Sequence, residues 1–308
     1  MYGHPPLSTD SIGGALLDMW RFEVDDLTYA AVGYGSWHWL ATDGEGSRWF
    51  VTADDPNGPF PVDLAYPLAR RLEAAGLEFV RGPMPSQTGE VLCDVDGWLL
   101  SLWPWIDGRS MEFGRHATPA DLDATTACLA RLHNHRGVEQ VPGLVEDWAV
   151  SGRPDLEALL DEPHGSGPYA AETVELLTRG NARIRDGLGR YDHLTDQARA
   201  QRPRLVITHG EPHAGNVVHT DSGARLIDWD TVKWAPIERD LWHLVDYDDW
   251  ERGYGDVKVD DDLIELYRLN WELSEIADFA VLLLGATAKS QDHEVAITEL
   301  RRQLPDAD

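Results

Sequence analysis

The segment HGEPHAGN at residues 209–216, followed closely by IDWD at residues 227–230, is the most informative stretch of this sequence. Residues rich in β-branched side chains flank the turn sequence Asp-Ser-Gly at 221–223, which predicts a β-hairpin between the two motifs. Such a hairpin folds the side chains of Asn216 and Asp228 toward one point. We therefore expect an amide oxygen and a carboxylate to converge at one end of this hairpin.

The residue types in this stretch are those used in phosphoryl transfer. Amide and carboxylate oxygens are hard ligands suited to Mg²⁺, which keeps several waters and shares oxygens with a phosphate group. Glu211, in the loop that precedes the hairpin, can orient an acceptor hydroxyl and accept its proton. A protein that transfers phosphoryl groups mainly positions the reactants and neutralises charge. The stretch therefore predicts a phosphoryl-transfer site.

The same stretch resembles the catalytic loop and metal-binding segment of the aminoglycoside phosphotransferase family, which is related to the protein kinases. The family pattern is H-G-D-x-x-x-x-N, followed after a short hairpin by I-D. Two further segments are similar to the family, LARLH at residues 129–133 and ERDLW at residues 238–242. The resemblance implies an α+β, two-lobed, protein-kinase-like fold. Its small antiparallel-sheet lobe would bind nucleotide and span residues 1–102, and its mainly helical catalytic and substrate-binding lobe would span residues 103–308.

The resemblance also implies roles for individual residues. Asn216 and Asp228 would hold the metal, and Glu211 takes the position of the catalytic base. Asp240 would support the catalytic loop, and Asp230 would contact the metal directly or through a neighbour. The alternative for each acid is a solvated surface charge or, for Asp240, a helix cap.

Two departures from the family pattern concern the catalytic base and the phosphates. Glu211 stands where the family has aspartate, and the extra methylene displaces the carboxylate by roughly 1 Å. Thr52 stands where kinases place a third-strand lysine, and the sequence contains no lysine before residue 233. Either an arginine replaces the lysine, or metal carries more of the charge, or nucleotide binds weakly. The candidate arginines are Arg48, Arg70 and Arg71.

Two segments of the first lobe are candidates for nucleotide contacts. Gly33, Gly35 and Ser36 form a glycine-rich turn whose N–H groups and hydroxyl could bind phosphate. Ser101 and Trp103 lie where the resemblance places the hinge that contacts adenine. The alternatives are an ordinary hairpin turn and a strand leaving the sheet.

Histidines around the catalytic loop suggest a competing metal site. His209, His213 and His219 cluster with Glu211, but the order H-x-E-x-H lacks the helical spacing of a zinc hydrolase. We expect the ring of His209 to bond the backbone near the loop. His213 would either brace the loop or lie beside a phosphate.

The chain around these motifs predicts the rest of the fold. Five short strands with one helix from Asp63 precede a mainly helical region. The expected strands are 28–33, 36–42, 48–52, 90–94 and 97–102; the expected helices are 118–137, 172–188 and 264–283.

Charge and composition indicate which classes of molecule the protein could bind and where it is located. Asp and Glu number 54 against 26 Lys and Arg, for a net charge of −28, which disfavours nucleic acid and anionic membrane surfaces. The same charge would attract a cationic small molecule, although solubility is an equally good explanation. The longest apolar stretch, residues 276–288, is too short to span a bilayer. With no signal peptide and only two cysteines, we expect a cytoplasmic protein.

The expected activity is ATP- and Mg²⁺-dependent transfer of a phosphoryl group to a hydroxyl of a small, cationic molecule. An aminoglycoside-like antibiotic, and hence antibiotic resistance, is the leading interpretation, with the acidic segment 246–262 near the acceptor. The alternatives are a kinase for an amino alcohol or sugar, a kinase-fold binding protein with little catalysis, and a metal-dependent hydrolase. The sequence does not specify the oligomeric state.

Overall fold

A computed structural model describes residues 5–33, 35–111, 114 and 116–305 of the 308-residue chain. Contacts divide the chain into two compact units, residues up to 146 together with 204–258, and residues 147–203 together with 259 onward. The first unit therefore contains both the expected nucleotide-binding region and the HGEPHAGN motif. The expected lobe boundary after residue 102 remains a prediction.

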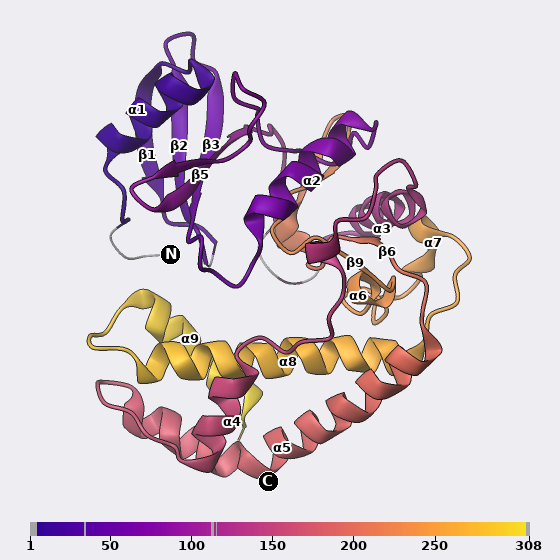
Figure 1. Cartoon of the computed structure of the whole chain (residues 1–308). Helices are drawn as coiled ribbons and strands as arrows, with labels where there is room; N and C mark the ends of the chain where they lie inside the picture. The colour runs from indigo at the N-terminus through magenta and orange to yellow at the C-terminus, as the bar shows by residue number, and fades with distance from the viewer. Residues whose placement is uncertain (1–4, 34, 112–113, 115, 306–308) are drawn as a thin grey trace. The chain divides into compact units, whose positions relative to one another are not determined.

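The first unit begins with a five-stranded antiparallel sheet in the order β1-β2-β3-β5-β4 (Figure 1). The turn after Asp43 closes with a hydrogen bond from the Gly46 N–H to the Asp43 carbonyl (2.9 Å), as its Asp-Gly sequence predicts. The strands are β1 (Val24–Ala30), β2 (Trp37–Asp43), β3 (Arg48–Asp54), β4 (Cys93–Val95) and β5 (Trp98–Pro104).

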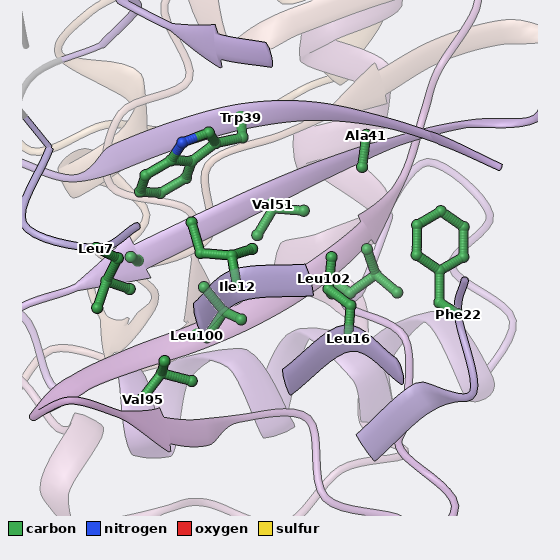
Figure 2. Close-up of a cluster of buried hydrophobic side chains, with 11 residues drawn as sticks. Leu7, Ile12, Leu16, Phe22, Trp39, Ala41, Val51, Val95, Leu100 and Leu102 are labelled. Carbon is green, nitrogen blue, oxygen red and sulfur yellow. The ribbon is translucent and has the colours of Figure 1, made fainter. Parts of the chain in front are cut away.

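One face of this sheet is covered by helix α1 (Thr9–Trp20), which the sequence analysis did not predict. Figure 2 shows Ile12 and Leu16 of this helix pointing into the same cluster as Trp39 of the sheet. Both α1 side chains are fully buried. The adjacent pair Gly13-Gly14 lowers local helix propensity, so packing stabilises α1 more than its own sequence does.

The remainder of the first unit carries the catalytic motifs on short elements. Strand β6 pairs with β9, and β7 pairs with β8 as the predicted hairpin. A capping box between Thr118 and Asp121 begins α3, as the sequence predicts. The elements are α2 (Val62–Ala74), α3 (Pro119–Asn134), η1 (Pro142–Leu144), β6 (Val206–Thr208), η2 (Ala214–Asn216), β7 (Val217–Thr220), β8 (Gly223–Leu226), β9 (Lys233–Ala235), α6 (Glu238–Leu241) and α7 (Glu251–Tyr254).

The second unit is helical, with α5 and α9 packed on α8. Helix α5 continues beyond its expected end because Tyr191, Leu194 and Ala198 extend its buried face. None of the helices in the described residues has the length and apolar composition needed to cross a membrane. The unit consists of α4 (Arg153–Asp161), α5 (Ala170–Gln201), α8 (Asp261–Leu284) and α9 (Gln291–Gln303); neither α4 nor α9 was predicted.

Candidate active site

The catalytic loop between β6 and β7 requires glycine at residue 210. Gly210 has a φ of +104°, and a Cβ there would lie 2.6 Å from the guanidinium of Arg239 and from Thr231 Oγ1. The same two residues hold the surrounding backbone: Arg239 donates to the Thr231 carbonyl (2.7 Å), and the Thr231 hydroxyl donates to the His209 carbonyl (2.7 Å). The backbone conformation of the loop is therefore set by tertiary contacts.

Asp240 supports this loop, in the position that the family resemblance implies. Its carboxylate accepts hydrogen bonds from the backbone N–H groups of His209 (2.9 Å) and Gly210 (2.6 Å). It also lies 2.9 Å from Nε2 of His133, which belongs to the LARLH motif on α3. Complete burial would raise the pKa of Asp240, but the hydrogen bond from His133 and nearby positive charges bring that pKa below its ordinary value.

The ring of His209 is structural, as expected. Its Nε2 donates to the carbonyl of Ile227 (2.8 Å), and its Nδ1 accepts from the N–H of Glu211 (3.3 Å). Burial lowers the pKa of His209, which favours the neutral ring that this pattern requires. Within the described part of the chain, no group of three or more His, Cys, Asp or Glu side chains is placed to hold a metal ion. The structure gives no support to the zinc-hydrolase alternative.

Asn216 and Asp228 lie at the same end of the β7–β8 hairpin. The Ile227 N–H donates to the Asn216 carbonyl (3.0 Å), so Asp228 directly follows the cross-strand partner of Asn216. The amide nitrogen of Asn216 donates to the Glu211 carbonyl (3.1 Å) and to Nε2 of His213 (3.3 Å). These bonds orient the amide through its nitrogen, whereas a metal would use its oxygen.

The carboxylate of Asp228 is open to solvent although protein atoms surround it. Restricted solvation raises its pKa, and burial together with the charges of Asp228, Glu211 and Asp54 raises the pKa of Asp230 well above its ordinary value. These four acids therefore repel one another, and a divalent cation would relieve that repulsion. One accessible carboxylate and one amide oxygen match the small protein ligand set of Mg²⁺, so the residues fit that ion.

Glu211 and His213 lie beside Asn216. Nε2 of His213 is 3.9 Å from the Glu211 carboxylate and accepts from the Asn216 amide. Burial lowers the pKa of His213 to about 4, so its ring is neutral at pH 7. Of the two predicted roles for His213, bracing of the loop matches these contacts.

In the glycine-rich turn, Gly33 and Gly35 both have positive φ, +68° and +94°. Tyr34 between them lies outside the described residues. The Ser36 hydroxyl, predicted to reach phosphate, donates instead to Oδ1 of Asp54 (2.5 Å) in this structure. Asp54 also accepts from the Tyr66 hydroxyl (3.1 Å). Sequence reasoning missed Asp54 and Tyr66; the available signal was an acid two residues after the expected lysine position.

Thr52, at that lysine position, is buried and lies 3.3 Å from Nδ1 of His38. Two of the three candidate arginines are engaged elsewhere. Arg48 forms an ion pair with Asp107, and Arg70 forms one with Glu73 (2.7 Å); the third, Arg71, is exposed on α2. Two of the three candidates are therefore paired with acids other than those of the catalytic motifs.

The expected hinge residues interact with each other and with the segments around them. Buried Ser101 accepts a hydrogen bond from Nε1 of Trp103 (2.9 Å), whose ring contacts Tyr66 edge-on. The carbonyl of Leu102 between them accepts from the N–H of Met84 (2.7 Å). One backbone group of this hinge is therefore already satisfied within the protein.

Comparisons with known proteins identify proteins that are similar to this chain in sequence and in fold. Protein StrN of Streptomyces griseus is 28% identical over 296 residues, which cover 92% of this chain and 88% of that protein. The structure superposes on a spectinomycin phosphotransferase, APH(9)-Ia, in complex with ADP and spectinomycin, with a TM-score of 0.78 at 18% identity, covering 98% and 96% of the two chains. A microcompartment-associated aminopropanol kinase gives a TM-score of 0.63 at 15% identity, covering 96% and 95%.

These structural likenesses confirm the protein-kinase-like α+β fold that the sequence predicts. The model of the phosphotransferase enzyme family matches residues 26–279, which is most of the chain. This chain therefore belongs to the phosphotransferase enzyme family and is a phosphotransferase with an alcohol group as acceptor.

Proposed function

We propose that this enzyme uses Mg²⁺-ATP to phosphorylate a hydroxyl of a small, cationic amino-containing molecule. The observation that carries the proposal is the alignment of Asn216 and Asp228 across the hairpin, beside a loop anchored by Asp240. Asn216 and Asp228 would hold Mg²⁺, which supplies positive charge to the phosphate oxygens when it is bound.

The chain's own residues position the acceptor and its proton. Glu211 would accept the proton of the acceptor hydroxyl through its carboxylate. The hydrogen bonds from Asn216 to the Glu211 carbonyl and from the Glu211 N–H to His209 hold the backbone of Glu211 beside Asn216, which supports this role. Asp240 holds the two loop residues before Glu211, so the acceptor site would be formed before substrate binds.

Acidic surface supports a cationic acceptor. Beside α7 lies an open recess of about 680 Å³, bordered by the carboxylates Asp249, Glu251 and Asp256. The one arginine at its border, Arg252, donates to Asp123 (2.8 Å), which neutralises part of its charge. A recess with this balance favours ammonium groups over anions. Spectinomycin, bound in the APH(9)-Ia complex, is the first acceptor that we would test.

Transfer of radiolabelled γ-phosphate from ATP to a panel of acceptors tests the proposal. The panel should contain aminocyclitol and aminoglycoside antibiotics, amino alcohols such as aminopropanol, and neutral sugars. We expect Mg²⁺-dependent transfer to an amino-containing acceptor, lost with EDTA and restored by excess Mg²⁺. Transfer only to neutral sugars would contradict the cationic acceptor, and transfer unaffected by EDTA would contradict the metal assignment.

A further inference from the structure

The sheet face that carries a lysine in kinases has a different set of side chains here. Because side chains alternate along a strand, Thr52 and Asp54 project from the same face of β3. Both are nearly buried, with 5% and 4% of their surfaces exposed. The register that pairs His38 with Thr52 places Ser36 opposite Asp54. This face therefore presents hydrogen-bonding groups where a kinase presents a cation.

Asp54 connects three elements of the structure through its two carboxylate oxygens. Oδ1 accepts from the hydroxyl of Ser36, the last residue of the glycine-rich turn, at 2.5 Å. Oδ2 accepts from the hydroxyl of Tyr66 on α2, at 3.1 Å. The ring of Tyr66 is buried and packs edge-on against Trp103 of β5, with centroids 4.9 Å apart. The turn, strand β3 and helix α2 are thus tied to a single buried group.

The side chain of His38 lies beside the same turn. His38, bonded to Thr52, stacks on Phe50, and its Nε2 would lie 3.2 Å from a Cβ added at Gly33. Glycines with positive φ are conformationally soft, so a turn that carries Gly33 and Gly35 needs outside contacts to keep one shape. The hydrogen bond at Ser36 supplies one of them.

In protein kinases, the third-strand lysine performs two tasks: it contacts the phosphates and it pairs with a glutamate on the following helix. The second task connects strand to helix. Here Asp54 and Tyr66 make the corresponding connection between β3 and α2 with a hydrogen bond. We propose that Asp54 is a positioning residue for nucleotide binding: through its hydrogen bonds with Ser36 and Tyr66 it holds Ser36, at the end of the glycine-rich turn, in place against β3 and α2. This inference rests on the proposed use of ATP.

Two single variants test the proposal, because each removes one hydrogen bond to Asp54 and leaves the rest of the side chain nearly unchanged. Ser36→Ala and Tyr66→Phe each delete one hydroxyl, and Tyr66→Phe retains the ring against Trp103. We expect each to raise KM for ATP and the Kd of Mg²⁺-AMP-PNP by about fivefold, with little change in kcat, because a hydrogen bond to a carboxylate is lost from a binding element. Ser36→Thr restores the hydroxyl and should restore KM.

Thr28→Ala is the matched control, since it deletes an exposed hydroxyl that donates to Asp26 (2.8 Å) in the same sheet. It should leave KM for ATP unchanged. The double variant Ser36→Ala/Tyr66→Phe should weaken nucleotide binding by less than the product of the single effects, because both act through Asp54. Thermal unfolding of each variant separates loss of binding from loss of fold.

Three results would overturn the inference: an unchanged KM in Ser36→Ala, an equal fall of kcat in all variants, or strictly multiplicative effects in the double variant. Each of these leaves the proposed function intact if the wild-type enzyme transfers phosphate from ATP. Failure of the wild-type enzyme to bind Mg²⁺-AMP-PNP overturns both proposals.

Discussion

Two buried aspartates show how differently the catalytic loop and the nucleotide-binding sheet are built. Asp240 accepts two backbone N–H groups and faces His133; burial raises its pKa, but the hydrogen bond from His133 and nearby positive charges bring it below its ordinary value. Asp54 accepts two hydroxyls, and burial, together with repulsion from Asp228, raises its pKa to about 6. The comparison teaches that backbone N–H groups and His133 stabilise the carboxylate of Asp240 in the loop, whereas the carboxylate of Asp54 in the sheet is held by two neutral hydroxyl groups and is repelled by Asp228.

The largest expected effect concerns Asp228, the proposed metal ligand at the end of the hairpin. Asp228→Ala should reduce phosphoryl transfer by at least about a thousandfold, because charge on the phosphate oxygens would no longer be neutralised in place. Steady-state transfer of labelled phosphate measures the loss. Asp221→Ala, which removes an exposed carboxylate from the turn of the same hairpin, is the control and should transfer normally. Near-normal turnover in Asp228→Ala would refute the metal assignment.

The next effect concerns the base position. Glu211→Gln preserves the size of the side chain but cannot accept the acceptor proton, so kcat should fall about a hundredfold with the KM for ATP unchanged. A pH–rate profile checks the cause, because the acidic limb of the wild-type profile should disappear in the variant. An unchanged kcat would show that another group accepts the proton. The presence of glutamate instead of the family's aspartate at residue 211 would then not affect catalysis.

A smaller effect is expected on folding stability, through Asp240. Asp240→Asn leaves one of its donors without a charged acceptor in a fully buried site, and should lower the free energy of unfolding by about 2–3 kcal/mol. Because the folded-state pKa of Asp240 is depressed, its stabilisation is present at neutral pH and is lost as pH falls below about 4. Urea unfolding at pH 7 measures the difference. Asp186→Asn, at an exposed position on α5, should leave stability unchanged.

The smallest expected effect is on stability and concerns Asp54, whose contribution falls as pH rises, whereas the contribution of Asp240 falls as pH decreases. The pKa of Asp54 is about 6 in the folded protein against 3.8 ordinarily, so the folded state takes up a proton as pH falls from 6 to 4. The contribution of Asp54 to stability should therefore decrease, by up to about 2 kcal/mol, as pH rises from 4 to 6, and the stability of Asp54→Asn should change with pH by that much less than the stability of the wild type. Urea unfolding at pH 4, 5, 6 and 7 tests it. Equal slopes in both proteins would show that Asp54 is ionised normally.

Several features were predictable because they depend on local sequence. The capping box at Thr118, the Asp-Gly turn after Asp43 and the hairpin that aligns Asn216 with Asp228 all occur as expected. Each results from contacts between residues close together in the chain. The structural role of His209 followed from the same motif.

Other features depend on contacts between distant residues and were missed. Helix α1 is formed across a Gly-Gly pair because Ile12 and Leu16 are buried against the sheet. Ser36 was expected to face phosphate, yet it donates to Asp54, 18 residues away, which the pairing of β2 with β3 brings opposite it. Neither contact has a signature within one segment.

The sequence by itself determined the reaction class of this protein: the motifs at residues 209–216 and 227–230 predict phosphoryl transfer, and the hairpin between them aligns Asn216 with Asp228 because its turn is set by local sequence. Only the tertiary structure decided how the lobe without lysine is held together. There, Asp54 joins Ser36 and Tyr66 from separate elements, and the burial that makes these bonds strong exists only after the elements have packed.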